Sequence, residues 1–315
     1  MITVTRAMTQ GLGLALASAS LLAFLWLLLV LVALPPSLVM SSAIRDSLGS
    51  SRIADTVADE MNLAWLGEFQ AEASRLSETL TAPLLGKTAV FVTIEDWWTG
   101  ELFRGQLGLV ALGVFTALAW ALCLGGILDR FHRGRERFSI GRFFAAGGSQ
   151  FPRFVRLAAL SAVLYYGIYR LARWLFPWIE RATVEVTVER TVLLLNGLAA
   201  LVILTLLVFV HLVFDYAKIA IVVEERRSAL LAAVRGLGFV VRNPSRALGV
   251  YSGFLALTAL LLAGHWIVAP GVTQGTTLGV LVSFGYAQLL LVARLVLRLG
   301  LLGASMRLFE SHRYG

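Results

Sequence analysis

The sequence predicts an all-α membrane protein. We expect six transmembrane helices, two amphipathic elbow helices on the cytoplasmic side and a small helical segment outside. Hydrophobic residues form 58% of the chain and mean hydropathy is +0.80, both well above an ordinary globular domain. Several apolar runs are long enough to cross about 30 Å of hydrocarbon, and each is continuously apolar, which excludes barrel strands. We expect one transmembrane domain over 1–315, with spans at 11–34, 105–128, 157–178, 191–214, 248–269 and 277–302.

The first apolar run follows a short segment that carries Arg6. Its core, Gly11 to Leu34, is longer than the ~7–15 residues of a cleavable secretory signal. We therefore expect an uncleaved anchor. Pro35 and Pro36 come directly after this core, and we expect them to stop the helix at the outer surface.

The basic residues predict the orientation. Segments 129–156 and 215–247 are rich in arginine, whereas segment 35–104 has ten Asp or Glu and five Lys or Arg. Because positive loops stay inside, we expect both basic segments and both termini in the cytoplasm of a bacterial inner membrane. The net charge of +8 then matches anionic lipid headgroups as partners, and no nucleic-acid partner is expected.

The acidic segment 35–104 is expected outside the membrane. Within it, residues 41–84 have the apolar spacing of one or two surface helices, with a break at Gly49. The segment is too small and polar to form its own core, so it either packs on the helix bundle or contacts a membrane-protein partner through residues 41–98. Residues 87–94 are expected to dip into the interface ahead of two anchoring tryptophans, Trp97 and Trp98.

Two features mark the outer ends of the third and fourth spans. Arg170 and Arg173 lie among aromatic residues, where they can extend to the interface or bind an anion. The alternating stretch from Thr183 to Glu189 is interpreted as an extension of the fourth helix. That extension would place Glu185 and Glu189 one turn apart.

The two basic segments resemble each other. Aligning Ser139 with Ser228 also pairs Gly147 with Gly236, and an aspartate, Asp129 or Asp215, ends each preceding span. Each serine can cap a short helix, and Pro152 or Pro244 would mark the return to the membrane. The repeat also pairs four arginines that we predict bind lipid headgroups: Arg153 with Arg242, and Arg156 with Arg246.

The stretch from Asp215 to Leu248, DYAKIAIVVEERRSALLAAVRGLGFVVRNPSRAL, resembles a signature of a large group of bacterial six-helix membrane proteins. That group in turn is similar to the membrane domain of some glycerophosphodiester phosphodiesterases. The resemblance covers the six spans, the acidic outer segment and the two basic elbows. It implies an inner-membrane location and a link to lipids or the envelope. We see no soluble phosphodiesterase domain in these residues and do not expect that activity.

One charge network is predicted. His211 and Asp215 lie four apart on one helix face, as do Arg294 and Arg298 in the sixth span. The arginines could pair with Asp215 or Glu224 and hold two helices in register. The same residues could instead form a proton or anion pathway, or support catalysis, and the sequence leaves these readings open.

Other chemistry is not indicated. Cys123 is the only cysteine, and the four histidines are scattered, so neither a disulfide nor a metal site is expected. Ser139 and Ser228 lack the context of a hydrolase nucleophile, and no Gly-rich phosphate-binding motif is present. We expect no enzyme and no cofactor. The predicted function is handling or scaffolding of lipid or envelope components, with a coupled transporter or a subunit of a larger membrane complex as alternatives.

Overall fold

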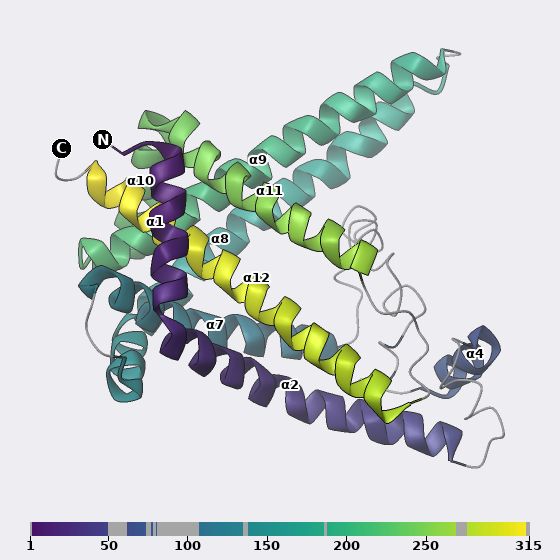
Figure 1. Ribbon diagram of the computed structural model, residues 1–315. Helices are drawn as coiled ribbons and strands as arrows, with labels where there is room; N and C mark the ends of the chain where they lie inside the picture. Colours follow the sequence, from purple (N-terminus) through teal and green to yellow (C-terminus); the bar gives the residue numbers. More distant parts are fainter. Residues whose placement is uncertain are drawn as a thin grey trace. The chain divides into compact units, whose positions relative to one another are not determined.

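The computed structural model describes residues 2–49, 62–73, 77, 80, 107–134, 138–185, 188–268 and 276–312. The described part contains nine α-helices and no strands (Figure 1). They are α1 (Val4–Ala17), α2 (Ala19–Leu48), α4 (Leu63–Glu72), α7 (Leu107–Arg133), α8 (Ile140–Ala182), α9 (Glu189–Val223), α10 (Ala229–Arg242), α11 (Pro244–Val268) and α12 (Thr277–Ser311). Six of these are long and apolar enough to cross a membrane: α2, α7, α8, α9, α11 and α12. The predicted set of six apolar helices is confirmed.

The helices form two compact units. Unit 1 comprises Met1–Leu14, Leu118–Phe254 and Gly300–Gly315, and unit 2 comprises Ala15–Ala117 and Leu255–Leu299. Unit 1 therefore contains both basic segments together with the first and last residues of the chain.

The first span differs from its predicted bounds. Ser18 separates α1 from α2, and α2 then continues through Pro35 and Pro36 to Leu48, so the prediction that these prolines stop the helix is wrong. A proline removes only its own N–H donor, and membrane helices tolerate this loss where other groups satisfy the freed carbonyls. The helix ends instead at Gly49, where the sequence predicted a break.

Helix α8 also passes through a predicted turn. It begins after Ser139 and contains Pro152 in its interior, so segment 129–156 does not end in a separate short helix. At 1.5 Å per residue its 43 residues extend for about 65 Å, twice the thickness of the hydrocarbon core. The second basic segment differs because α10 ends at Arg242 and Pro244 opens α11, where a proline loses no helical hydrogen bond.

The stretch from Thr183 to Glu189 is not an extension of α9. Helix α8 ends at Ala182, Thr183 to Glu185 form a turn, and α9 begins at Glu189. The Thr183 hydroxyl donates to the Ile179 carbonyl at 2.8 Å and closes the end of α8. Because Glu185 lies in this turn and Glu189 is the first residue of α9, the two glutamates do not share one helix face.

The core of unit 1 surrounds the second half of α9. Between Leu212 and Val223 only Asp215 and Lys218 are not buried, and both α8 and α10 pack against this helix. Aromatic rings extend the core: Phe239 lies 4.4 Å from Tyr216 and 5.2 Å from Phe309, measured between ring centroids. The apolar residues on every side of this half of α9 thus form the centre of the unit.

Two glycines bring helix backbones into direct contact. A Cβ on Gly147 of α8 would collide with the Leu122 carbonyl of α7, and Gly125 of α7 faces the same glycine. A Cβ on Gly236 of α10 would collide with the Val213 carbonyl of α9 and lie 2.8 Å from the Ala217 nitrogen. The two glycines paired by the sequence alignment therefore have the same role, because each seats a basic segment on the span before it.

The ends of the two spans match as well. Gly134 and Glu225 both adopt left-handed backbone conformations, with φ of +77° and +48°, and each follows its contacted carbonyl by twelve residues. Ser139 and Ser228 then precede α8 and α10, although only the Ser228 hydroxyl accepts a capping bond, from the Leu231 N–H. Asp129 lies near the end of α7 as predicted, whereas α9 continues from Asp215 to Val223, so the prediction that Asp215 ends its span is wrong.

Helix α1 is held in unit 1 by small residues. Gly11 lies against the Gly300 carbonyl and the Ala304 backbone of α12, leaving no room for a side chain. On α11, Gly249 faces the Val4 side chain and Gly253 faces Met8. Small residues spaced along two helices let the α1 backbone approach closely, as is common in membrane helix packing.

In unit 2, α4 packs on the end of α2. Asn62 caps α4 by accepting hydrogen bonds from Ala64 and Trp65 N–H groups at 3.0 and 3.1 Å. Trp65, Leu66 and Phe69 form a buried cluster against Ala43, Ile44 and Leu48. The predicted surface helix is thus present at Leu63–Glu72 and forms a small core with the end of α2, while Trp97, Trp98 and residues 87–94 lie outside the described residues.

Two interhelical hydrogen bonds join the apolar helices of unit 2. Trp26 of α2 donates its indole N–H to Gln288 of α12 at 2.8 Å. His265 of α11 contacts the Tyr286 hydroxyl of α12 at 3.1 Å with the rings stacked. Polar pairs of this kind stabilise helix association where the surrounding lipid offers no partner.

Alanine substitutions test the two backbone contacts against matched neighbours. Gly147→Ala and Gly236→Ala should each lower the free energy of unfolding by about 1–3 kcal/mol, because the new methyl group meets a carbonyl that cannot move without its helix. Gly148→Ala and Gly238→Ala add a methyl group into open space and should be neutral or slightly stabilising. Thermal unfolding in detergent would measure both pairs, and equal effects within a pair would contradict the packing role.

Candidate functional site

Asp215 is paired with two basic side chains of its own helix, α9, one on each side of it in the sequence. Its carboxylate lies 3.2 Å from His211 Nε2 and 2.7 Å from Lys218 Nζ. On the other side of the imidazole, Nδ1 lies 3.4 Å from the Tyr165 hydroxyl of α8. A proton on Nε2 satisfies Asp215 and leaves Nδ1 to accept from Tyr165, so the three side chains form one hydrogen-bonded row. The predicted His211–Asp215 pair is present, and sequence reasoning missed Lys218 and Tyr165 as its partners.

Glu224 is the acceptor of a second cluster. It accepts hydrogen bonds from Arg226 in the adjoining loop and, at 2.9 Å, from Arg235 of α10. The Arg235 guanidinium also lies 5.9 Å from the centre of the Phe309 ring. Burial alone would raise the pKa of Glu224, but the two guanidinium donors outweigh burial and hold that pKa below its ordinary value. The cluster fastens the loop after α9 to α10.

Arg294 and Arg298, the predicted partners on the sixth span, belong to unit 2. They lie in α12, whereas Asp215 and Glu224 belong to unit 1. Their pairing with the two carboxylates stays a prediction.

The four predicted headgroup arginines fall in different surroundings. Arg156 and Arg242 are exposed, and Arg153 is half-buried. Arg246 donates to His312 Nε2 at 2.8 Å, while His312 Nδ1 lies 2.9 Å from the Leu308 carbonyl. Arg246 therefore helps to hold the end of α12, and the exposed pair is better placed to meet lipid.

The structure adds a feature that the sequence did not predict: a polar cleft of about 500 Å³ in unit 1. The ends of α7 and α9, the first turns of α8 and the loop after α9 surround it. Its lining residues, which define the polar cleft below, are Asp129, His132, Arg133, Ala146, Ser149, Gln150, Arg153, Ile221, Val222, Glu225 and Arg227. This volume lies within the range of pockets that bind small ligands.

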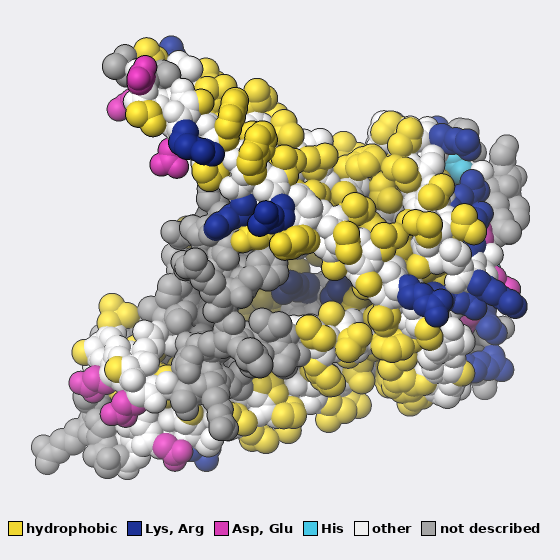
Figure 2. Space-filling view, turned by 180° about the vertical axis from the view of Figure 1, so that it is seen from behind, with side chains coloured by type: hydrophobic (Ala, Val, Ile, Leu, Met, Phe, Trp, Pro, Cys, Tyr) yellow, Lys and Arg dark blue, Asp and Glu magenta, His cyan; other side chains and the backbone are white. Residues whose placement is uncertain are grey.

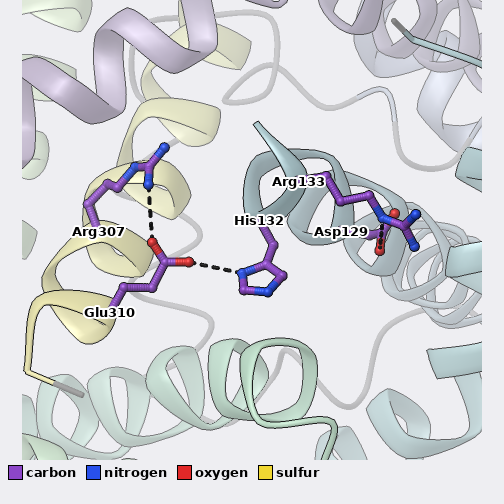
Figure 3. Close-up of polar contacts among 5 residues, drawn as sticks. All are labelled: Asp129, His132, Arg133, Arg307 and Glu310. Carbon is purple, nitrogen blue, oxygen red and sulfur yellow. Dashed lines mark hydrogen bonds and ion pairs between the residues drawn. The ribbon is translucent and has the colours of Figure 1, made fainter. Parts of the chain in front are cut away.

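Ion pairs fix one wall of the polar cleft. Arg133 donates to Asp129 one turn earlier on α7 at 3.0 Å (Figure 3). Next to them, Glu310 of α12 lies between His132 at 2.9 Å and Arg307 at 3.2 Å. The end of α7 is thereby tied to α12, and the remaining donors of Arg133 stay available to a ligand.

The other charged groups of the polar cleft have no such partners. Among the described residues, none forms an ion pair with Arg153, Arg227 or Glu225, and none donates to the buried Oε1 of Gln150. Two cations, one anion and one buried acceptor therefore line the same space. One structural clue to their role is that Glu225 follows the Val213 carbonyl by twelve residues, as Gly134 follows the Leu122 carbonyl.

Comparison of the chain with protein-family models, with curated proteins and with solved structures found no match. Six apolar helices make the protein a multi-pass integral membrane protein. Within the described ranges, no three His, Cys, Asp or Glu side chains come together as ligands for a metal ion. The polar cleft and the exposed arginines are the features on which a functional account can be built.

The Glu224 cluster predicts a pH dependence. A carboxylate with a lowered pKa stabilises the fold when the pH is above 4.5, the ordinary pKa of glutamate. This stabilisation is lost as the pH falls through the folded-state pKa. Glu224→Gln should therefore cost on the order of 1 kcal/mol at pH 7, and its difference from wild type should shrink below pH 4.5. Thermal unfolding between pH 7 and 3 would measure this difference, with the exposed Glu180→Gln as control. An equal gap at every pH would contradict the role assigned to Glu224.

Proposed function

We propose that this protein is an inner-membrane protein that handles or scaffolds lipids, with its basic segments resting on anionic headgroups at the cytoplasmic face. The observation that carries the proposal is the outer face of α10. This helix is apolar on two opposite sides, and only one of them is covered within unit 1.

The inner side of α10 packs in the core, where Ala232, Gly236 and Val240 are buried. The outer side presents a stripe of apolar side chains that are 41–61% exposed: Leu230, Val234, Leu237 and Val241. These positions follow one line along the helix because they repeat every three or four residues. Exposing such a stripe to water is unfavourable, and the boundary between headgroups and acyl chains would cover it.

Charges flank the stripe as an interfacial helix requires. Arg227 precedes α10 and Arg242 ends it, and both are exposed. The first turns of α8 resemble this arrangement, with exposed Ile140 and Phe144 on either side of Arg142. In Figure 2, Lys and Arg side chains gather at one edge, beside a broad hydrophobic surface. This pattern supports contact of α10 and of the first turns of α8 with the membrane surface.

The same reasoning supports the orientation. Both termini, the ends of α7 and α9, and α10 belong to unit 1, together with most of the arginines of segments 129–156 and 215–247. The positive-inside rule places these elements in the cytoplasm and the turn after α8 outside. The resemblance to bacterial six-helix inner-membrane proteins agrees with this placement and remains part of the proposal.

Proton-coupled transport is the second candidate. The row of Tyr165, His211 and Asp215 joins α8 to α9, and ionisable groups inside spans often mark proton paths. Asp215→Asn would abolish transport under this reading. If Asp215 is structural, the variant should lower thermal stability and leave lipid retention unchanged.

Lipid retention tests the leading proposal. The protein would be purified gently from native membrane and the bound lipids and proteins identified by mass spectrometry. Each arginine near an anionic surface contributes about 1 kcal/mol, roughly a fivefold change in binding. The double variant Arg156→Gln/Arg242→Gln should therefore retain on the order of tenfold less anionic lipid than wild type.

The matched control is Arg181→Gln/Arg190→Gln, which neutralises two exposed arginines at the other end of α8 and α9. It should retain lipid like wild type. Equal retention in both double variants would contradict the proposal. A protein that co-purifies in stoichiometric amount would favour the third candidate, a subunit of a larger complex, and would direct attention to residues 41–98.

A further inference from the structure

Building on the lipid function proposed above, we infer that the polar cleft binds an ethanolamine phosphate group, a ligand that carries one phosphate and one primary ammonium. The inference rests on charged groups of the cleft that form no ion pair with a described residue. These groups include both cations and an anion, and a simple anionic ligand would pair only with the cations.

The cationic side of the polar cleft fits a phosphate. Arg153 extends from α8 and Arg227 from the loop after α9, so a phosphate between them would be held from two elements. A guanidinium offers paired N–H donors whose spacing matches two phosphate oxygens. Arg133 adds a third set of donors, since Asp129 takes up only its Nε–H.

The acceptor side fits a primary ammonium. Glu225 lines the polar cleft and forms no ion pair with a described residue, and the Oε1 of Gln150 is buried without a described donor. A primary ammonium has three N–H donors and can satisfy both acceptors, which otherwise cost free energy. A quaternary choline group has no N–H to donate, and a glycerol headgroup has no positive charge, so both should bind less well.

The backbone of Glu225 gives an independent reason to expect a functional role. Its φ of +48° lies in the left-handed region, which disfavours residues with a Cβ. Gly134, which lies at the same spacing after its contacted carbonyl in the first basic segment, adopts this conformation without strain. Glutamate at a position suited to glycine stores strain in the fold, and strained residues concentrate at binding sites.

The ligand could reach the polar cleft from two sources. A phosphatidylethanolamine would bring the group on a lipid, and free phosphoethanolamine would bring it in solution. The test uses the full chain in nanodiscs of phosphatidylglycerol with added phosphatidylethanolamine or phosphatidylcholine, and native mass spectrometry counts the bound lipids. Calorimetry in pure phosphatidylglycerol nanodiscs measures soluble phosphoethanolamine.

Wild type should bind the ethanolamine compound about tenfold more tightly than its choline counterpart, the gain expected from charge-assisted hydrogen bonds. Glu225→Gln should lose this preference while phosphate binding remains. Arg153→Gln/Arg227→Gln should weaken ethanolamine and choline lipids alike. Glu180→Gln and Arg181→Gln, which neutralise exposed residues at the far end of α8, should behave as wild type.

Glu225→Gly separates a binding role from a structural one. Glycine relieves the left-handed strain, so the variant should unfold at a higher temperature than wild type. The same variant should lose the preference for ethanolamine over choline. A variant that is more stable and still selective would overturn the inference.

The remaining outcomes are distinct. Binding of soluble phosphoethanolamine without lipid selectivity would support the site and assign its ligand to the free compound. Equal binding of ethanolamine, choline and glycerol lipids by wild type, together with no binding of soluble phosphoethanolamine, would overturn the inference. If Arg156→Gln/Arg242→Gln still loses anionic lipid in that case, the proposed lipid function stands without this site. If it does not, both fail.

Discussion

Unit 1 depends on direct contact between helix backbones at Gly147 and Gly236. Lipid provides no hydrophobic force that drives one membrane helix onto another, so close packing and polar contacts must supply the association. Each glycine lets the backbone of a basic segment pack directly against the backbone of the preceding span, because it has no side chain. The loops that connect these helices are consequently short, and their charged residues are held at fixed places around the polar cleft.

Two carboxylates in this region, Glu224 and Glu310, join separate elements, whereas Asp215 pairs within α9. Asp215, Glu224 and Glu310 each meet two basic side chains, and all three contacts lie in unit 1. Such pairs keep charges satisfied near the membrane and tie α12 to α7 and α10 to the loop after α9. Against this background, Arg153, Arg227 and Glu225 stand out, because they line one space and none of them forms an ion pair with a described residue.

The sequence predicts correctly those features that depend on long, uninterrupted stretches of the chain. The long apolar runs predict the six apolar helices, and the alignment of the two basic segments pairs Gly147 with Gly236, which make the same kind of backbone contact. Sequence reasoning failed where several spatial neighbours decide the outcome. Pro35, Pro36 and Pro152 stay inside helices whose other hydrogen bonds compensate. The β-branched residues around Thr183 lower the helix propensity, and α8 ends there in a turn. The polar cleft could not be predicted, since three helix ends converge to form it.

The account requires that the polar cleft and the basic segments face the cytoplasm, and cysteine labelling tests this most directly. Cys123 is only 2% exposed, so a reporter cysteine at Arg227 or at the 76% exposed Val184 can be labelled over a low background. A membrane-impermeant maleimide should modify Val184→Cys in spheroplasts and Arg227→Cys only in inside-out vesicles. Labelling of Arg227→Cys in intact spheroplasts, or of both positions from one side, would contradict the account.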